Sequence, residues 1–180
     1  MKTAHHRNPG DPDAREVIER TIRVDQAGEF GAVRIYEGQL AALRWTGRSN
    51  SETGRRIQHM ASQERNHNKV FDRLLVERRV RPTLLSPLWS VAGFALGAAT
   101  ALMGDKAAMA CTVAVEETIE EHYAEQAAAL GDDEKDLRAT VEKFRDEALA
   151  AGAEQAVGYE ALSAVIKTGS RLAIWLSTRI

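Results

Sequence analysis

The stretch QERNH, residues 63–67, places a carboxylate and an imidazole three residues apart inside a helical pattern. Apolar residues continue the same pattern on both sides of Glu64 and His67, in steps of three and four, which is the spacing of one helix face. These apolar residues are Ile57, Met60, Phe71 and Leu74. Burial of a charged group costs several kcal/mol unless it is paired. We therefore expect either a partner side chain on another helix or a metal ion at this face.

Two further segments carry an acidic residue on an equivalent stripe. In the segment from about residue 13 to 43 the stripe includes Glu29, and Gly28 and Gly31 leave space around that side chain. Its members are Ile18, Ile22, Asp25, Glu29, Ala32, Tyr36, Leu40 and Leu43. In the segment that begins near residue 105 the members are Met109, Thr112, Glu116, Ile119, Tyr123 and Leu130. Three helices are thus predicted to direct a carboxylate inward near their middle.

Three carboxylates and one imidazole cannot share an apolar interior as bare anions, and a divalent or trivalent metal ion would remove their repulsion. Oxygen ligands combined with imidazole suit iron or manganese, and helical bundles hold such ions between facing helices. The alternative is that Glu29 or Glu116 pairs with an arginine such as Arg34 or reaches water. The coincidence of all three carboxylates on inner stripes favours the metal site.

The bulk properties indicate a single domain. The chain has 180 residues, a formal net charge of −2 and no basic run with interleaved aromatic residues, so a nucleic-acid partner is not expected. Its one cysteine, Cys111, excludes an internal disulfide and a cysteine-based zinc site. Residues 1–12 are polar and include proline and glycine, which predicts a flexible N-terminal tail before one helical domain over residues 13–180. His5 and His6 in this tail are interpreted as solvated.

Helical periodicity dominates the chain, and alternating strand patterns are nearly absent, so we predict an all-α fold. The expected helices cover about 13–43, 52–79, 105–130, 133–151 and 159–180.

The stretch PTLLSPLWSVAGFALGAATALMG, residues 82–104, contains no charged residue. It is long enough to span a bilayer, but its prolines, glycines and alanines make it only moderately apolar. Arginines precede it directly, and the apolar C-terminal segment 159–180 also carries basic residues, a combination that suits an anionic lipid surface. We expect contact with a membrane surface; the alternative is a buried core helix or an oligomer interface.

Four stretches closely resemble the demethoxyubiquinone hydroxylases, which are ferritin-like di-iron monooxygenases of ubiquinone biosynthesis. The stretches are RTIRVDQAGEFGAVRIYEGQLAAL (20–43), QERNH (63–67), RVRPTLLSPLWSVAGFALGAATALMGDKAAMACTVAVEETIEEHY (79–123) and KFRDE (143–147). The resemblance implies a ferritin-like antiparallel four-helix bundle with additional hydrophobic, membrane-docking helices. It also implies that the chain hydroxylates the ring of a demethoxyubiquinol-type lipid with dioxygen.

The same resemblance assigns roles to individual residues. The catalytic iron ligands that it implies are Glu29, Glu64, His67 and Glu116. Glu64 would bridge two irons, and the adjacent His122 and Tyr123 match a His-Tyr pair near the family's site. From the sequence alone, a core histidine and a packing tyrosine are an equally good interpretation of that pair.

The chain departs from the family pattern on the fourth bundle helix. The family carries a second Glu-x-x-His after the KFRDE segment, whereas this chain has Ala148 and Ala151 on the inner stripe and is shorter by about two helical turns. No histidine follows in the remaining chain. Glu147 stands one position off the stripe, and Glu154 lies further along. Glu147 is therefore a candidate metal ligand only if the backbone shifts.

The resemblance implies several partners: a demethoxyubiquinol-type quinone lipid, dioxygen, NADH or the quinol itself as reductant, and a membrane surface. It also suggests a homo-oligomer, and a peripheral location at the cytoplasmic face of the inner membrane if the source is bacterial. One alternative is a non-catalytic quinone- or lipid-binding relative with an incomplete metal site. Another is a simple ferritin-like iron binder, which the charge-free 82–104 segment disfavours.

Overall fold

The computed structural model describes residues 12–152 and 158–180, and within these ranges the chain is all-α, as predicted. Its helices are α1 (Ala14–Trp45), α2 (Glu52–Arg78), α3 (Ser86–Leu102), α4 (Asp105–Ala129), α5 (Lys135–Gly152) and α6 (Glu160–Ser177), with a 3-10 turn, η1 (Asp132–Glu134), before α5. The predicted tail over residues 1–12 lies, except for Pro12, outside the described residues, as do His5, His6 and Glu154.

Local sequence signals explain where the two longest helices begin and end. The side chain of Asp13 accepts a hydrogen bond from the backbone N–H of Glu16 at 2.7 Å and caps the start of α1. Ser51 caps α2 in the same way through the N–H of Gly54 at 3.0 Å. Helix α2 ends at Arg78 and is capped by Arg79, which adopts the left-handed conformation with φ of 55°. These caps agree with the predicted helix ends to within about two residues.

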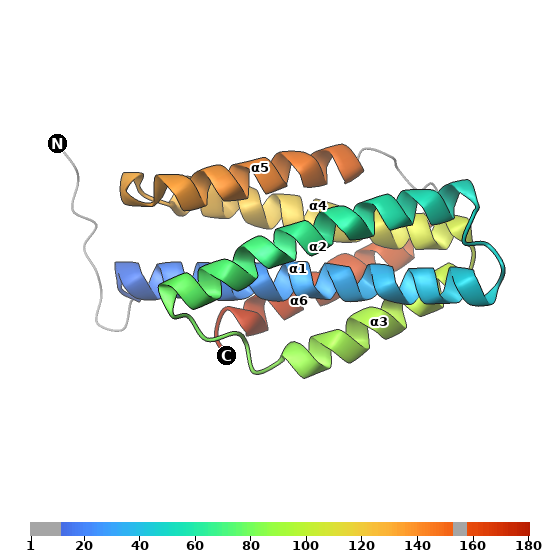
Figure 1. Ribbon diagram of the computed structural model, residues 1–180, viewed down its shortest axis with the longest axis horizontal. Coiled ribbons are helices and arrows are strands. Elements are labelled where there is room, and N and C mark those ends of the chain that lie inside the picture. Colours follow the sequence, from blue (N-terminus) through green and yellow to red (C-terminus); the bar gives the residue numbers. More distant parts are fainter. Residues whose placement is uncertain (1–11, 153–157) are drawn as a thin grey trace.

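Consecutive helices run in opposite directions, and the molecule is elongated along them (Figure 1). Helix α1 packs against α2 on one side and α3 on another, while α4 packs against α5 and α6. The stripes of α1, α2, α4 and α5 face one another and form the apolar interior. One cluster of this interior surrounds Tyr36 and Leu43, and a second surrounds Phe71, Tyr123 and Phe144.

Helix α3 lies very close to α1 because glycines replace larger side chains where the two helices meet. A Cβ atom built on Gly97 would approach the backbone nitrogen of Gln39 to 3.0 Å, and one on Gly38 would approach that of Ala98 to 2.8 Å. No larger residue fits at either position without moving the helices apart. The charge-free segment is thus anchored to the helix that carries Glu29.

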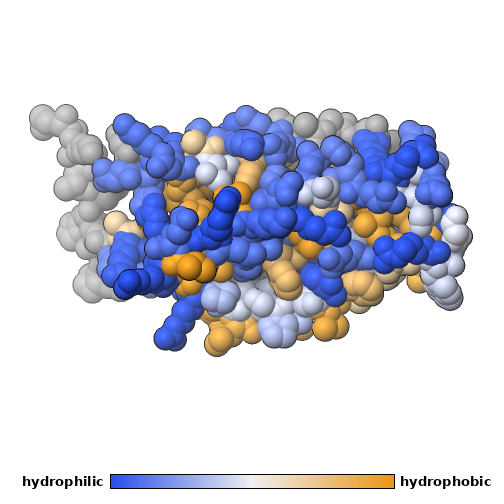
Figure 2. All heavy atoms as spheres, viewed as in Figure 1, coloured by the Kyte–Doolittle hydropathy of each residue, from blue (hydrophilic) through white to orange (hydrophobic). Residues whose placement is uncertain are grey.

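Hydrophobic residues remain exposed on the outer faces of α3 and α6. On these two helices they are Leu88, Val91, Leu102, Val165, Leu172 and Trp175. In Figure 2, polar residues cover the face formed by α2, whereas hydrophobic residues gather along the lower edge, where α3 lies in Figure 1. Within the described ranges, none of the helices combines the length and the hydrophobicity that crossing a bilayer requires; α3 has 17 residues.

Candidate metal centre

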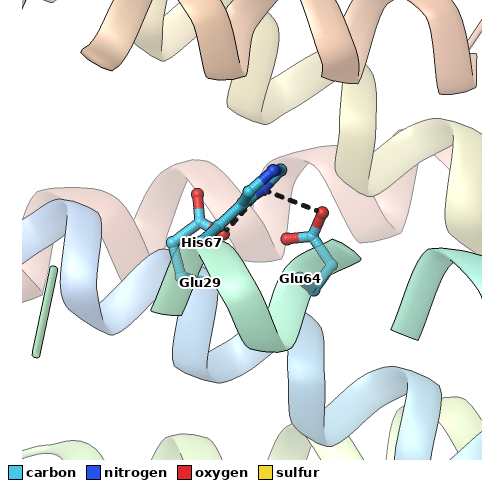
Figure 3. A group of neighbouring side chains, drawn as sticks. All are labelled: Glu29, Glu64 and His67. Carbon is cyan, nitrogen blue, oxygen red and sulfur yellow. Dashed lines mark ion pairs between the residues drawn. The ribbon is translucent and has the colours of Figure 1, made fainter. Parts of the chain in front are cut away.

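Three of the predicted residues meet between α1 and α2. Glu29, Glu64 and His67 each offer one ligand atom, and these atoms all lie within 4.8 Å of one another. Nδ1 of His67 is 3.5 Å from Oε2 of Glu29 and 3.3 Å from Oε1 of Glu64 (Figure 3). One imidazole nitrogen therefore faces two carboxylates that come from neighbouring helices.

The group is buried and strongly coupled in charge. The exposed fraction is 1% for Glu29, 6% for Glu64 and 7% for His67. Burial and the nearby charge of Glu29 raise the pKa of Glu64 to about 8. Burial by itself would lower the pKa of His67, but the carboxylates of Glu29 and Glu64 raise it to about 11. Without a metal ion, a protonated imidazole supplies the positive charge between the carboxylates.

Glu116 of α4 lies beside this group. It is 2% exposed, and burial together with the charge of Glu64 raises its pKa to about 8. A small polar space is lined by Glu64, His67, Glu116 and Glu147, together with Met60 and Gln63. Three of the four predicted ligands therefore border this space, and Glu29 adjoins them through Nδ1 of His67.

Among the residues that the structure describes, Arg34 does not pair with the acidic residues of the group. Arg34 forms an ion pair with Glu37 and donates a hydrogen bond to the carbonyl oxygen of Ser90 at 3.3 Å. Both of these partners lie outside the polar space, so Arg34 offers its charge to neither Glu29 nor Glu116.

Two buried tyrosines donate hydrogen bonds to the acidic residues. The hydroxyl of Tyr123 donates to Oε1 of Glu29, and that of Tyr36 donates to Oε1 of Glu116. The other oxygen of Glu29, Oε2, is buried and accepts no hydrogen bond. A buried carboxylate oxygen without a donor is costly, and a cation at this point would satisfy it. The donor set therefore fits a metal ion.

Tyr36 was not predicted as a site residue, although its place on the inner stripe of α1, seven residues after Glu29, was the available signal.

His122 lies in a polar cluster next to the group rather than within it. Its Nε2 is 3.3 Å from Oδ1 of Asp25, to which Gln126 also donates a hydrogen bond at 2.6 Å. Burial raises the pKa of Asp25, and the contact with His122 opposes that rise. This cluster was missed because both partners are polar residues that ordinary helix surfaces also carry.

Helix α5 contributes Glu147 but no inner carboxylate. Ala148 is buried on the inner face, as the stripe predicted. Oε2 of Glu147 lies 2.5 Å from Nε2 of His67, so this side chain reaches the histidine without a shift of the helix. The ring of Phe144 stacks on the imidazole of His67 with centroids 3.9 Å apart.

A separate apolar cavity of about 470 Å³ lies among α1, α3, α4 and α6. Gly28 and Gly31 line it, and a Cβ atom at either position would meet no atom within 4 Å. The space that these glycines were expected to leave therefore belongs to this cavity. Trp89 of α3 and Ile174 of α6 also line it.

The family model described as ubiquinone biosynthesis protein COQ7 matches residues 16–177. The chain belongs to this family. Among the COQ7 relatives, the 3-demethoxyubiquinol 3-hydroxylase of Rhodospirillum rubrum is 55% identical over 99% of this chain and 86% of its own length. The NADPH-dependent 3-demethoxyubiquinone 3-hydroxylase, mitochondrial, of Dictyostelium discoideum is 52% identical over 92% of this chain and 79% of its own. The human protein of the same name is 48% identical over 93% of this chain and 80% of its own length. The resemblance inferred from the sequence is confirmed.

Proposed function

We propose that this chain is a metal-dependent hydroxylase that acts on the ring of a demethoxyubiquinol-type lipid in ubiquinone biosynthesis. The observation that carries the proposal is the buried group of Glu29, Glu64 and His67 in a COQ7 family member. Buried carboxylates around an imidazole have no role in lipid binding alone, and two of the relatives are named for this hydroxylation.

Iron is the metal that we propose, because mixed oxygen and imidazole ligands suit it and ferritin-like bundles hold it in this way. Glu29, Glu64 and His67 would hold the first ion, and Glu64 and Glu116 would provide carboxylates for a second. The second ion would have no imidazole, because Ala151 stands where the family pattern has histidine, and Ala148 replaces an acidic ligand. We therefore expect the first ion to be bound more tightly than the second.

When bound, iron supplies the activation of dioxygen. The hydroxyl of Tyr36 holds one oxygen of Glu116, and that of Tyr123 holds one oxygen of Glu29. These hydrogen bonds fix the direction of the second oxygen of each carboxylate. One oxygen atom enters the quinol ring and the other leaves as water, which requires two external electrons. A reduced nicotinamide would supply them: the sequence suggested NADH, while the names of two relatives specify NADPH.

The apolar cavity beside Gly28 and Gly31 is the proposed site for the quinone lipid. Its volume of about 470 Å³ falls within the range of small-molecule sites. Its lining is almost wholly apolar, which suits an isoprenoid tail. Two of the exposed apolar residues of α6, Val165 and Leu172, line the same cavity. The exposed apolar residues of α3 and α6 would contact the membrane that supplies the lipid.

We propose a peripheral location at a membrane surface, and for a bacterial source the cytoplasmic face of the inner membrane. Arg179, whose guanidinium lies 4.0 Å from the ring of Trp175, would meet anionic lipid headgroups there. A homo-oligomer formed through the remaining apolar surface is part of the same proposal.

A non-catalytic quinone-binding relative is the second candidate. Ala148 favours it, because a buried methyl group at this position provides no ligand for a second ion. The cavity does not depend on Ala148, so quinone binding would survive the loss of the chemistry.

The test begins with anaerobic loading of Fe(II), followed by elemental analysis and Mössbauer spectroscopy. Loaded protein is then given a short-chain demethoxyubiquinol, NADPH or NADH, and ¹⁸O₂. We expect one labelled oxygen in the product, and loss of both iron and product in Glu64→Ala and His67→Ala. Glu77→Ala, at an exposed position of the same helix, is the control. Quinol binding without product would support the second candidate, and unchanged iron in both variants would refute the metal centre.

A further inference from the structure

Glu147 reaches His67 from the side opposite the other carboxylates. Nδ1 of the imidazole faces Glu29 and Glu64, whereas Nε2 faces Oε2 of Glu147 at 2.5 Å. The two ring nitrogens thus have separate partners: Glu29 and Glu64 at Nδ1, and Glu147 at Nε2.

The position of Glu147 differs from that of a metal ligand. Among the described residues, the group whose ligand atoms lie within 4.8 Å of one another contains Glu29, Glu64 and His67 but not Glu147. The Glu147 side chain is 34% exposed, compared with 1% for Glu29 and 8% for Glu64. Its second oxygen, Oε1, points toward Lys143, whose Nζ lies 3.8 Å away. Oε1 is therefore engaged outside the buried group, whereas Oε2 contacts the histidine of that group.

Phe144, one turn earlier on α5, acts on the same imidazole. Its ring stacks on that of His67 at 3.9 Å with an angle of 24° between the planes. Stacking restrains the tilt of the imidazole but leaves it free to flip about χ2. A hydrogen-bond acceptor at Nε2 removes this freedom, because only one of the two flipped orientations keeps that bond.

We propose that Glu147 is a positioning residue: it accepts the Nε2–H of His67 and so keeps Nδ1 as the nitrogen that faces the metal. A carboxylate in this role fixes the tautomer and the ring orientation of a ligating histidine and strengthens its metal binding. The inference rests on the proposed metal centre. Helix α5 would thus still support the site through the histidine of α2, even though Ala148 provides no ligand.

Metal affinity provides the first test, with Co(II) as a visible-absorption probe in place of iron. Glu147→Ala should weaken Co(II) binding about 10- to 100-fold, the usual cost of losing such a partner. Glu147→Gln retains an oxygen that accepts the Nε2–H and should lose much less. Glu142→Ala, at an exposed position of the same helix, should bind as the parent does. Equal and severe losses in the Gln and Ala variants would identify Glu147 as a direct ligand, and no loss in either would remove its role.

Proton NMR of the metal-free protein, labelled with ¹⁵N-histidine, provides a readout that does not require metal. The Nε2–H of His67 should give a low-field, slowly exchanging resonance in the parent and in Glu147→Gln, and lose it in Glu147→Ala. The ¹⁵N label distinguishes this proton from the Nδ1–H that faces Glu29 and Glu64. An Nε2–H resonance that persists in Glu147→Ala would overturn the proposal. If the parent bound no Co(II), the metal centre would fail, whereas the NMR result would still decide whether Glu147 orients the histidine. Circular dichroism of each variant verifies that it is folded.

Discussion

Replacement of Gly31 by leucine should close the quinone site without disturbing the metal centre. A Cβ atom at Gly31 meets no atom within 4 Å, so the new side chain can extend into the cavity of about 470 Å³. Removal of a glycine from a helix interior contributes about 0.5–1 kcal/mol to stability. Burial of a leucine side chain contributes up to about 1.5–3 kcal/mol more. The free energy of unfolding should therefore rise by about 1 kcal/mol or more.

Tryptophan fluorescence measures whether the cavity has closed. Trp89 lines the cavity, whereas Trp45 and Trp175 are exposed by 80% and 52% and can be replaced by phenylalanine. In this background a short-chain quinone should quench Trp89. Gly31→Leu should weaken that binding at least about tenfold, equivalent to about 1.4 kcal/mol.

The control is Gly28→Ala, which adds a single methyl group to the same cavity and should retain quinone binding. Iron content should be unchanged in Gly31→Leu, because Glu29 faces the other side of α1. Full quenching in Gly31→Leu would show that the quinone binds elsewhere. A loss of stability would show that the cavity is not open at this position.

Three other perturbations test separate parts of the structure. Gly38→Ala should lower the free energy of unfolding by about 3 kcal/mol, measured with urea, because its Cβ would lie 2.8 Å from a backbone nitrogen of α3 and force the helices apart. In the metal-free protein the pKa values of Glu64 and Glu116 are about 8, above their ordinary value of 4.5, so the folded state retains protons that the unfolded state loses. The contribution of these two groups to the free energy of unfolding is complete below pH 4.5 and is lost as the pH rises through 8. Each group loses at most about 1.4 kcal/mol per pH unit. Urea midpoints should therefore fall across this range, and a flat profile would contradict the raised pKa values. The double variant Ala148→Glu, Ala151→His should raise the iron content toward two per chain by elemental analysis; an unchanged content would mean that this face of α5 is turned away from the centre.

The stripes predicted the convergence of Glu29, Glu64 and His67 because burial repeats every three to four residues along a helix, and this pattern is local. The contact of Glu147 did not follow from that pattern. It lies about 100° from the stripe, and its long side chain covers the difference by reaching around the helix. The pairing of Tyr36 with Glu116 depends on the relative heights of α1 and α4, which no local pattern contains.

The cavity was also beyond prediction from one stretch of sequence. Its walls come from helices far apart in the chain, and its space comes from side chains that are absent at Gly28 and Gly31. The charge-free segment 82–104 was expected to contact a membrane surface, or to form a buried helix or an oligomer interface, and most of it forms α3. Its close docking through Gly97 against α1 depends on a helix pair that forms only in the folded protein.

Helix α1 is used on two sides: Glu29 faces the candidate metal centre, whereas Gly31 and Gly38, about two turns apart, lie on the other side, at the cavity and against the backbone of α3. Each side tolerates a different set of side chains, so few substitutions in the middle of α1 satisfy both. Helix α5 packs mainly against α4, and this chain departs from the family pattern there, at Ala148. In evolutionary terms, the ligands on α5 are the ones that the fold can lose most easily. A library of random substitutions selected only for folding should retain far more diversity in α5 than in α1.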